Sequence, residues 1–88
     1  MEDLTKLPNI GPVLAEKLKA VGVTTYEDLA RIGSVETILK IREDDPGACY
    51  NMLYALEGAI QKVRWHALPK EERQLLKEEL DEAKGWGK

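Results

Sequence analysis

The residues whose types and spacing could bind a ligand lie in a short turn near the start of the chain, residues 7–12. Pro8 fixes its own φ angle, and Gly11 can adopt backbone angles that a side chain would forbid. Pro12 suits the first turn of a helix, where its missing N–H would have no partner in any case. A helix that begins in this way directs amide N–H groups outward, and the helix dipole adds positive potential there. The turn therefore predicts an anion site, with phosphate as the candidate ligand.

A phosphate at this turn would be held by three backbone amides and two lysine side chains. These nucleic-acid-binding residues would be Ile10, Gly11 and Val13, with Lys6 and Lys17 nearby. The alternative is a structural turn that joins two helices, and the sequence favours it because no basic residue follows Pro12 directly. The chain also has 13 Lys and Arg against 16 Asp and Glu, whereas most nucleic-acid-binding domains carry a basic excess.

A second group of residues combines aromatic rings with positive charge. It comprises Lys62, Arg64, Trp65 and His66. Such a group would suit a nucleic acid or an acidic partner, but the sequence favours a Trp65 that closes the core at a helix junction. Tyr50 and Tyr54 lie one helical turn apart and either contribute to a partner surface or line a second side of the core, because tyrosine is common in both settings.

Enzyme chemistry and metal binding have little support in the sequence. One Cys and one His cannot build a Cys/His zinc site within one chain. The acidic turn at Glu43, Asp44 and Asp45 is not followed by a calcium-binding pattern. No Ser/His/Asp set or glycine-rich phosphate loop is visible, and Cys49 falls on an apolar stripe where we expect it to be a buried small residue. We therefore expect a protein that is not an enzyme and that uses no cofactor and no metal.

The length and composition predict one small domain over residues 1–84 and a flexible tail over residues 85–88. A single cysteine excludes an intramolecular disulfide and suits a reducing cytoplasm. The acidic start lacks the apolar run of a signal peptide, and no apolar stretch is long enough to span a membrane. We expect a cytoplasmic protein.

Helical periodicity runs through the chain, and no strand alternation is visible. The first half predicts a short helix or arm over residues 2–7, a helix from Pro12 to Val21, and a third helix that begins in a Thr24–Glu27 capping box and ends near Gly33. Ser34 is expected to be the N-cap of a short fourth helix.

The second half carries the strongest helical pattern. Asp45 and Pro46 are expected to begin a fifth helix whose apolar stripe runs from Cys49 to Val63. A sixth helix should begin at Leu68-Pro69 and turn an apolar stripe inward, comprising Leu75, Leu76, Leu80 and Ala83. We predict an all-α fold: a compact, SAM-like bundle of five to six short helices around the fifth.

The turn resembles a helix-hairpin-helix motif, whose usual form is L-P-G-I-G-P followed by a helix with an early alanine. The matching residues are Leu7, Pro8, Ile10, Gly11, Pro12 and Ala15. Asn9 replaces the first glycine, and asparagine tolerates left-handed geometry better than most residues. In DNA-binding members of that class the hairpin amides grip a phosphate, often with a Lys or Arg just after the proline, where this chain has Val13 and Leu14.

The segments 50–61 and 64–69 resemble the C-terminal domain of the TfoX/Sxy family, as does the turn with residues 15–18. The resemblance runs from about Leu4 to Leu80. TfoX/Sxy proteins are bacterial regulators of natural DNA uptake that help to switch on competence genes. Their full-length members place an α/β domain before this one, and that domain is absent from the sequence, so we expect a stand-alone C-terminal domain.

The resemblance implies a non-catalytic bacterial regulatory or interaction module. Its partner would be a protein of the transcription machinery or a second copy of the chain in a homodimer. The alternative function is weak, sequence-independent DNA binding through the hairpin at residues 8–13.

Overall fold

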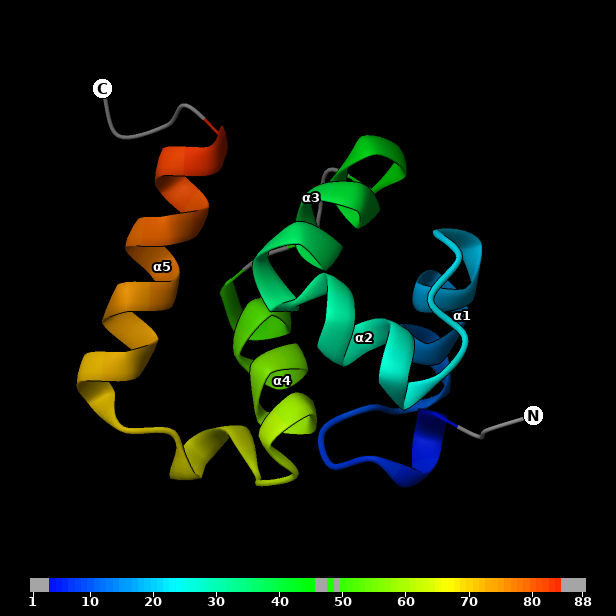
Figure 1. Ribbon diagram of the computed structural model, residues 1–88, viewed down its shortest axis with the longest axis horizontal. Helices are drawn as coiled ribbons and strands as arrows, with labels where there is room; N and C mark the ends of the chain where they lie inside the picture. The colour runs from blue at the N-terminus through cyan, green and yellow to red at the C-terminus, as the bar shows by residue number, and fades with distance from the viewer. Residues whose placement is uncertain (1–3, 46–47, 49, 85–88) are drawn as a thin grey trace.

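The computed structural model describes residues 4–45, 48 and 50–84, and in this part of the chain all regular structure is helical (Figure 1). Five α-helices and two 3-10 helices follow one another along the chain. They are η1 (Leu4–Lys6), α1 (Pro12–Ala20), α2 (Tyr26–Ile32), α3 (Ser34–Asp44), α4 (Tyr50–Gln61), η2 (Trp65–Ala67) and α5 (Lys70–Lys84). The predicted all-α bundle is confirmed.

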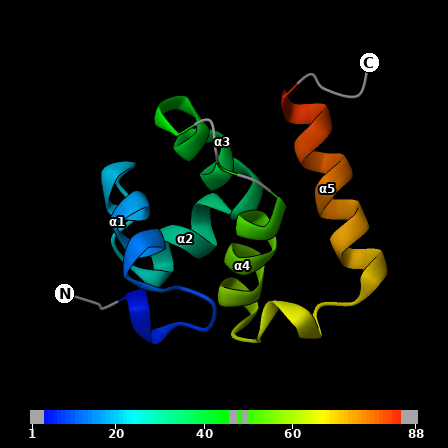
Figure 2. The same ribbon diagram turned by 180° about the vertical axis from the view of Figure 1, so that it is seen from behind.

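Helix α4 is the central element of the bundle. It contacts α2, α3, α5 and η2, and it lies between α5 on one side and α1 and α2 on the other (Figure 1 and Figure 2). Its buried face comprises Leu53, Ala55, Leu56, Gly58 and Ala59. The 3-10 helix η2 turns the chain at the end of α4, so that α5 runs back along α4 and also reaches α3.

The core takes at least one fully buried aliphatic side chain from each of the five α-helices, among them Leu18, Leu29, Ile38, Leu53, Leu56 and Leu80. The stripe predicted for the last helix is partly wrong. Leu76 and Leu80 are buried, but Leu75 is 62% exposed and Ala83 is also exposed. Helix α5 packs on α3 and α4 with one narrow side, and residues i and i+4 share that side whereas the neighbour Leu75 is turned away from it.

The capping box of α2 lies one residue later than the sequence pattern indicated. Thr25, not Thr24, is the N-cap, and its hydroxyl accepts the N–H of Asp28 at 3.0 Å. The Asp28 carboxylate accepts the N–H of Thr24 at 3.2 Å, and Arg31 donates to it at 3.2 Å. The bond from the Thr24 amide, followed by that from Arg31, lowers the pKa of Asp28.

Ser34 is not the N-cap of α3, contrary to the prediction. Gly33 takes that position with a φ of 90°, a conformation that side chains disfavour. This glycine ends α2 and begins α3 without a connecting loop, which makes Ser34 the first helical residue. The buried Ser34 hydroxyl donates instead to Glu57 Oε1 at 2.7 Å, across to α4.

Helix α4 begins at Tyr50 rather than at Asp45-Pro46. Asp45 is the C-cap of α3, and its N–H donates to the Ile41 carbonyl at 2.9 Å. Pro46 and Cys49, which were predicted to begin this helix and to lie on its stripe, fall outside the described residues, as does the predicted tail over residues 85–88. Val63 lies beyond the helix because Lys62 adopts a left-handed φ of 61°.

Asn9 holds the hairpin against the end of α4. Its φ of 71° provides the left-handed turn that a glycine would otherwise supply. Its amide nitrogen donates to the carbonyls of Val63 at 2.9 Å and Ala55 at 3.3 Å, and its amide oxygen accepts the N–H of Trp65 at 3.1 Å. Gly58 makes room for this side chain, because a Cβ at Gly58 would lie 2.5 Å from Asn9 Nδ2 and 2.8 Å from the Val63 carbonyl oxygen.

Replacing Asn9 with glycine should keep the turn and remove the three hydrogen bonds. We expect Asn9→Gly to lower the free energy of unfolding by about 2 kcal/mol, since the Val63 carbonyl and the Trp65 amide lose a partner. Urea denaturation followed by circular dichroism measures the change. An unchanged midpoint would mean that only the left-handed backbone matters at this position.

Gly58→Ala should destabilise the domain by about 1–3 kcal/mol, although alanine is the better helix former, because the new methyl group has no room. The same substitution in an Asn9→Gly background should cost less, since one of the two closest contacts is then absent. A double-mutant cycle by urea denaturation tests this. Equal costs in the two backgrounds would contradict the interlocking of these residues.

Candidate interaction surfaces

The hairpin presents fewer free amides than the phosphate hypothesis requires. Ile10 is buried, and its N–H donates to the Leu7 carbonyl at 3.4 Å within the turn. Gly11 is the N-cap of α1 in extended backbone geometry, and the first bond within the helix runs from the Ala15 N–H to the Gly11 carbonyl at 3.0 Å. The N–H groups of Val13 and Leu14 precede that bond, so they have no acceptor within the helix.

The two lysines predicted to assist the hairpin differ in their surroundings. The Lys17 ammonium forms an ion pair with the Asp45 carboxylate at the end of α3. Lys6 is exposed in η1, on the other side of the turn from α1. The structure therefore brings Gly11 and Val13 together at the start of α1, while Lys17 is already engaged by an acidic side chain.

A mainly apolar surface depression lies beside the start of α1, and we call it the hairpin groove. It is lined by Gly11, Pro12, Val13, Leu14, Lys17, Asn51 and Met52. Val13 is 71% exposed, and Leu14 and Met52 are half-buried. The surface that these residues line is mainly apolar. An exposed β-branched side chain at the mouth of an apolar groove suits contact with an apolar group of a partner.

The six residues predicted as an interaction site do not form one cluster. Tyr54, Trp65 and His66 form one stack, with ring centroids 6.1 Å apart for the first pair and 4.0 Å for the second. Arg73 of α5, which the sequence did not indicate, lies 5.9 Å from the Trp65 ring. Trp65 is half-buried where α4 meets α5, and this position fits the packing interpretation.

The other three predicted residues lie apart from this stack. The Lys62 ammonium is 4.6 Å from the ring centroid of Tyr26, and Arg64 is the exposed N-cap of η2. The Tyr50 hydroxyl donates to the Asp81 carboxylate of α5, and the Lys77 ammonium is 5.3 Å from the Tyr50 ring. The hydrogen bond to Asp81, followed by burial, raises the pKa of Tyr50.

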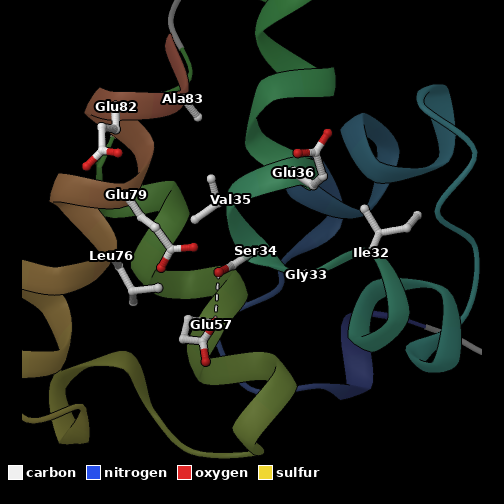
Figure 3. Close-up of a pocket in the computed structure, with 10 residues that line it drawn as sticks. All are labelled: Ile32, Gly33, Ser34, Val35, Glu36, Glu57, Leu76, Glu79, Glu82 and Ala83. Carbon is white, nitrogen blue, oxygen red and sulfur yellow. Dashed lines mark hydrogen bonds between the residues drawn. The ribbon is translucent and has the colours of Figure 1, made fainter. Parts of the chain in front are cut away.

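A second groove, which we call the acidic groove, lies where α5 passes the start of α3 (Figure 3). It is lined by Ile32, Gly33, Ser34, Val35, Glu36, Glu57, Leu76, Glu79, Glu82 and Ala83. Glu79 extends from α5 toward Ser34 and Glu57, Glu36 stands on the α3 side, and Glu82 stands on the α5 side (Figure 3). The lining holds four glutamates and no lysine or arginine.

Sequence reasoning missed the acidic groove. Its residues come from α2, α3, α4 and α5, and the sequence does not show that these segments meet. A partial signal is present, because Leu76, Glu79 and Ala83 follow helical i, i+3, i+7 spacing and share one face of α5. That spacing alone does not reveal which helix lies opposite.

Comparison with known proteins identifies first the class and then the family. The hairpin, the short helices and the central α4 define an all-α domain of the helix-hairpin-helix-containing kind. A family described as the TfoX C-terminal domain matches residues 1–80, and the chain belongs to this family. The resemblance inferred from the sequence is thereby confirmed.

Two solved structures are similar to the chain over nearly its full length. An uncharacterized protein from Listeria monocytogenes, in a triclinic crystal form, is 41% identical with a TM-score of 0.88, and the match covers 97% of each chain. A protein of unknown function from Listeria monocytogenes, in a tetragonal form, is 42% identical with a TM-score of 0.86, and the match covers 92% of this chain and 99% of that one. No protein of curated function matches the chain.

Within the described residues, no helix combines the length and the apolar character that a bilayer span requires.

The Tyr50–Asp81 bond makes stability depend on pH in the alkaline range. Because the pKa of Tyr50 is raised in the folded state, the unfolded chain loses this proton first as the pH rises above the ordinary tyrosine value of about 10. The contribution of the Tyr50–Asp81 hydrogen bond to stability is therefore present below that pH, and it is lost as the pH rises through the pKa of Tyr50 in the folded state. We expect Tyr50→Phe and Asp81→Asn each to flatten the fall in stability above pH 10, measured by urea denaturation. If the stability of both variants fell with pH as steeply as that of the wild type, this coupling would be contradicted.

Proposed function

We propose that this domain is a non-catalytic protein-interaction module of a bacterial regulatory system, and that a partner protein binds at the hairpin groove. The observation that carries the proposal is Val13, which is 71% exposed at the position where a phosphate-binding hairpin would place a cation. A partner would cover Val13 together with Leu14 and Met52, which line the same apolar groove.

The charges around the groove support a protein partner over DNA. Lys17 is neutralised by Asp45, so it adds little attraction for a phosphate. The whole chain carries a formal net charge of −3, which opposes long-range attraction of a polyanion. The partner we propose is a protein of the transcription machinery or a second copy of the domain, and the place of action is the cytoplasm.

Family membership is compatible with this proposal and gives it a biological setting. Proteins that carry the TfoX C-terminal domain include competence regulators, and we propose a regulatory role for the present chain by that relationship. The proposal needs no catalytic step. The hairpin groove and the acidic groove both lie at the surface and are open to solvent.

DNA binding through the hairpin is the second candidate, and one observation favours it. The amides of Val13 and Leu14 have no acceptor within α1, and the dipole of this nine-residue helix adds positive potential at that end. Lys6, exposed in the preceding 3-10 helix, would be the cation nearest to them in sequence. Such binding would be independent of sequence and strongly dependent on salt.

Photo-crosslinking from the groove tests the proposed partner contact. A photoreactive amino acid at position 13 should capture one defined protein in cells, whereas the same group at Leu75, an exposed aliphatic residue of α5, should not. When that purified protein is titrated, Val13→Glu should bind it at least about tenfold more weakly than the wild type, because a charge would enter an apolar contact. Leu75→Glu should bind it as tightly as the wild type. Equal binding by both variants would refute the assignment to this groove.

Gly11 allows a direct test of the DNA alternative. A side chain at this position would meet nothing within 4 Å, and aspartate is a favourable N-cap, so Gly11→Asp should fold at least as stably as the wild type. We expect the wild type to show no binding to a labelled duplex at low salt by fluorescence anisotropy. Binding that is lost in Gly11→Asp but kept in the neutral Gly11→Asn would establish a phosphate site and overturn the proposed function.

A further inference from the structure

The four glutamates of the acidic groove form no ion pair with the described side chains. The described residues contain ion pairs at Lys17–Asp45, Lys19–Glu16 and Arg31–Asp28. Among those same residues, no lysine or arginine nitrogen lies within ion-pair distance of any glutamate in the groove. The glutamates therefore give this part of the surface a negative charge.

Two of these glutamates are in positions that make a cationic neighbour favourable. Glu57 is half-buried, and its oxygens accept hydrogen bonds from the neutral groups of Ser34 at 2.7 Å and Gln61 at 2.8 Å. These bonds fix the carboxylate without neutralising it. Glu82 lies in the last turn of α5, where the negative end of the helix dipole disfavours an acidic side chain.

The glutamates do not gather tightly enough to hold a metal ion. In the part of the chain that the structure describes, no group of three or more His, Cys, Asp or Glu side chains has a metal-binding arrangement. The acidic groups come from three helices and are spread along the groove. A complementary ligand must therefore be extended and carry several separate positive charges.

Aliphatic side chains also line the groove between the glutamates. Ile32 and Val35 are half-buried, Leu76 is almost fully buried, and Ala83 contributes a small exposed side chain (Figure 3). Val35 rises between α3 and α5 at the middle of the labelled residues (Figure 3). The groove thus combines aliphatic side chains on its floor with the carboxylates of Glu57 and Glu79, and a ligand that fits both must be amphipathic.

We propose that the acidic groove is a second docking site, and that its occupant is a cationic amphipathic helix of a partner protein. Apolar side chains of that helix would cover Val35, Leu76 and Ala83, while its lysines and arginines would lie against the glutamates. The charges would give specificity and fast association, and the apolar floor would supply the buried area. This site does not depend on the hairpin groove, because α1 and α5 lie on opposite sides of α4.

The first experiment uses a labelled model peptide of about 14 residues, or four helical turns, with leucines along one face and lysines on the others. Fluorescence anisotropy should show that it binds the full chain and that the affinity falls with added salt. Two further peptides test the required chemistry: one with the same composition in scrambled order, and one with serines in place of the leucines. Both should bind at least about tenfold more weakly.

Matched variants of α5 locate the site. Glu79→Gln/Glu82→Gln removes two groove charges, whereas Glu71→Gln/Glu78→Gln removes two exposed charges of the same helix outside the groove. We expect the first variant to weaken binding of the amphipathic peptide about tenfold and the second to weaken it less than twofold. Val13→Glu should leave this binding unchanged, so failure at one groove is distinguishable from failure at the other.

Three outcomes would overturn the inference. The scrambled peptide could bind as well as the amphipathic one, which would reduce the interaction to net charge. The two double variants could lose affinity equally, which would place the contact outside the groove. Sedimentation velocity could show that the domain self-associates through a contact that Glu79→Gln/Glu82→Gln removes, which would make a second copy the occupant.

Discussion

The arrangement of this domain depends on the side-chain amide of Asn9. One residue provides a left-handed backbone turn and hydrogen bonds to the end of α4 and the start of η2. The hairpin is thereby fixed against the central helix, and the chain path from α4 into η2 is fixed at the same time. Since η2 directs α5 back along α4, the placement of the last helix also depends on this contact. Gly58 is the complementary half, because its missing side chain leaves the space that the amide occupies.

Much of the fold follows from local sequence signals. The helical periodicity, the proline and glycine positions and the apolar face of α4 predicted the number of helices and the central one. The errors lie where a local rule competed with a tertiary contact. Ser34 has the chemistry of an N-cap but bonds to Glu57, because Gly33 provides the turn. Leu75 and Leu76 are equivalent in local sequence, and only the position of α3 and α4 decides which one is buried.

The interaction surfaces could be predicted less well from the sequence than the fold, for the same reason. Asn9 was recognised as tolerant of left-handed geometry, but its partners lie 46, 54 and 56 residues away along the chain. Lys62 is close to Trp65 in sequence, yet it lies over the Tyr26 ring, whereas Trp65 stacks with Tyr54 and His66. The acidic groove draws on four helices, and its charge is visible only after they are assembled.

Because α5 is attached along one narrow side, the domain has two regions that differ in their free energy of local unfolding. Among the described side chains of α5, Leu76 and Leu80 are buried, and polar contacts secure each end through Gln61–Glu72 and Tyr50–Asp81. Releasing this helix would expose little apolar area compared with separating α1 to α4. Local unfolding of α5 therefore has a lower free energy than global unfolding, and the first four helices form the more persistent unit. Any partner that bridges α3 and α5 would convert these two units into one.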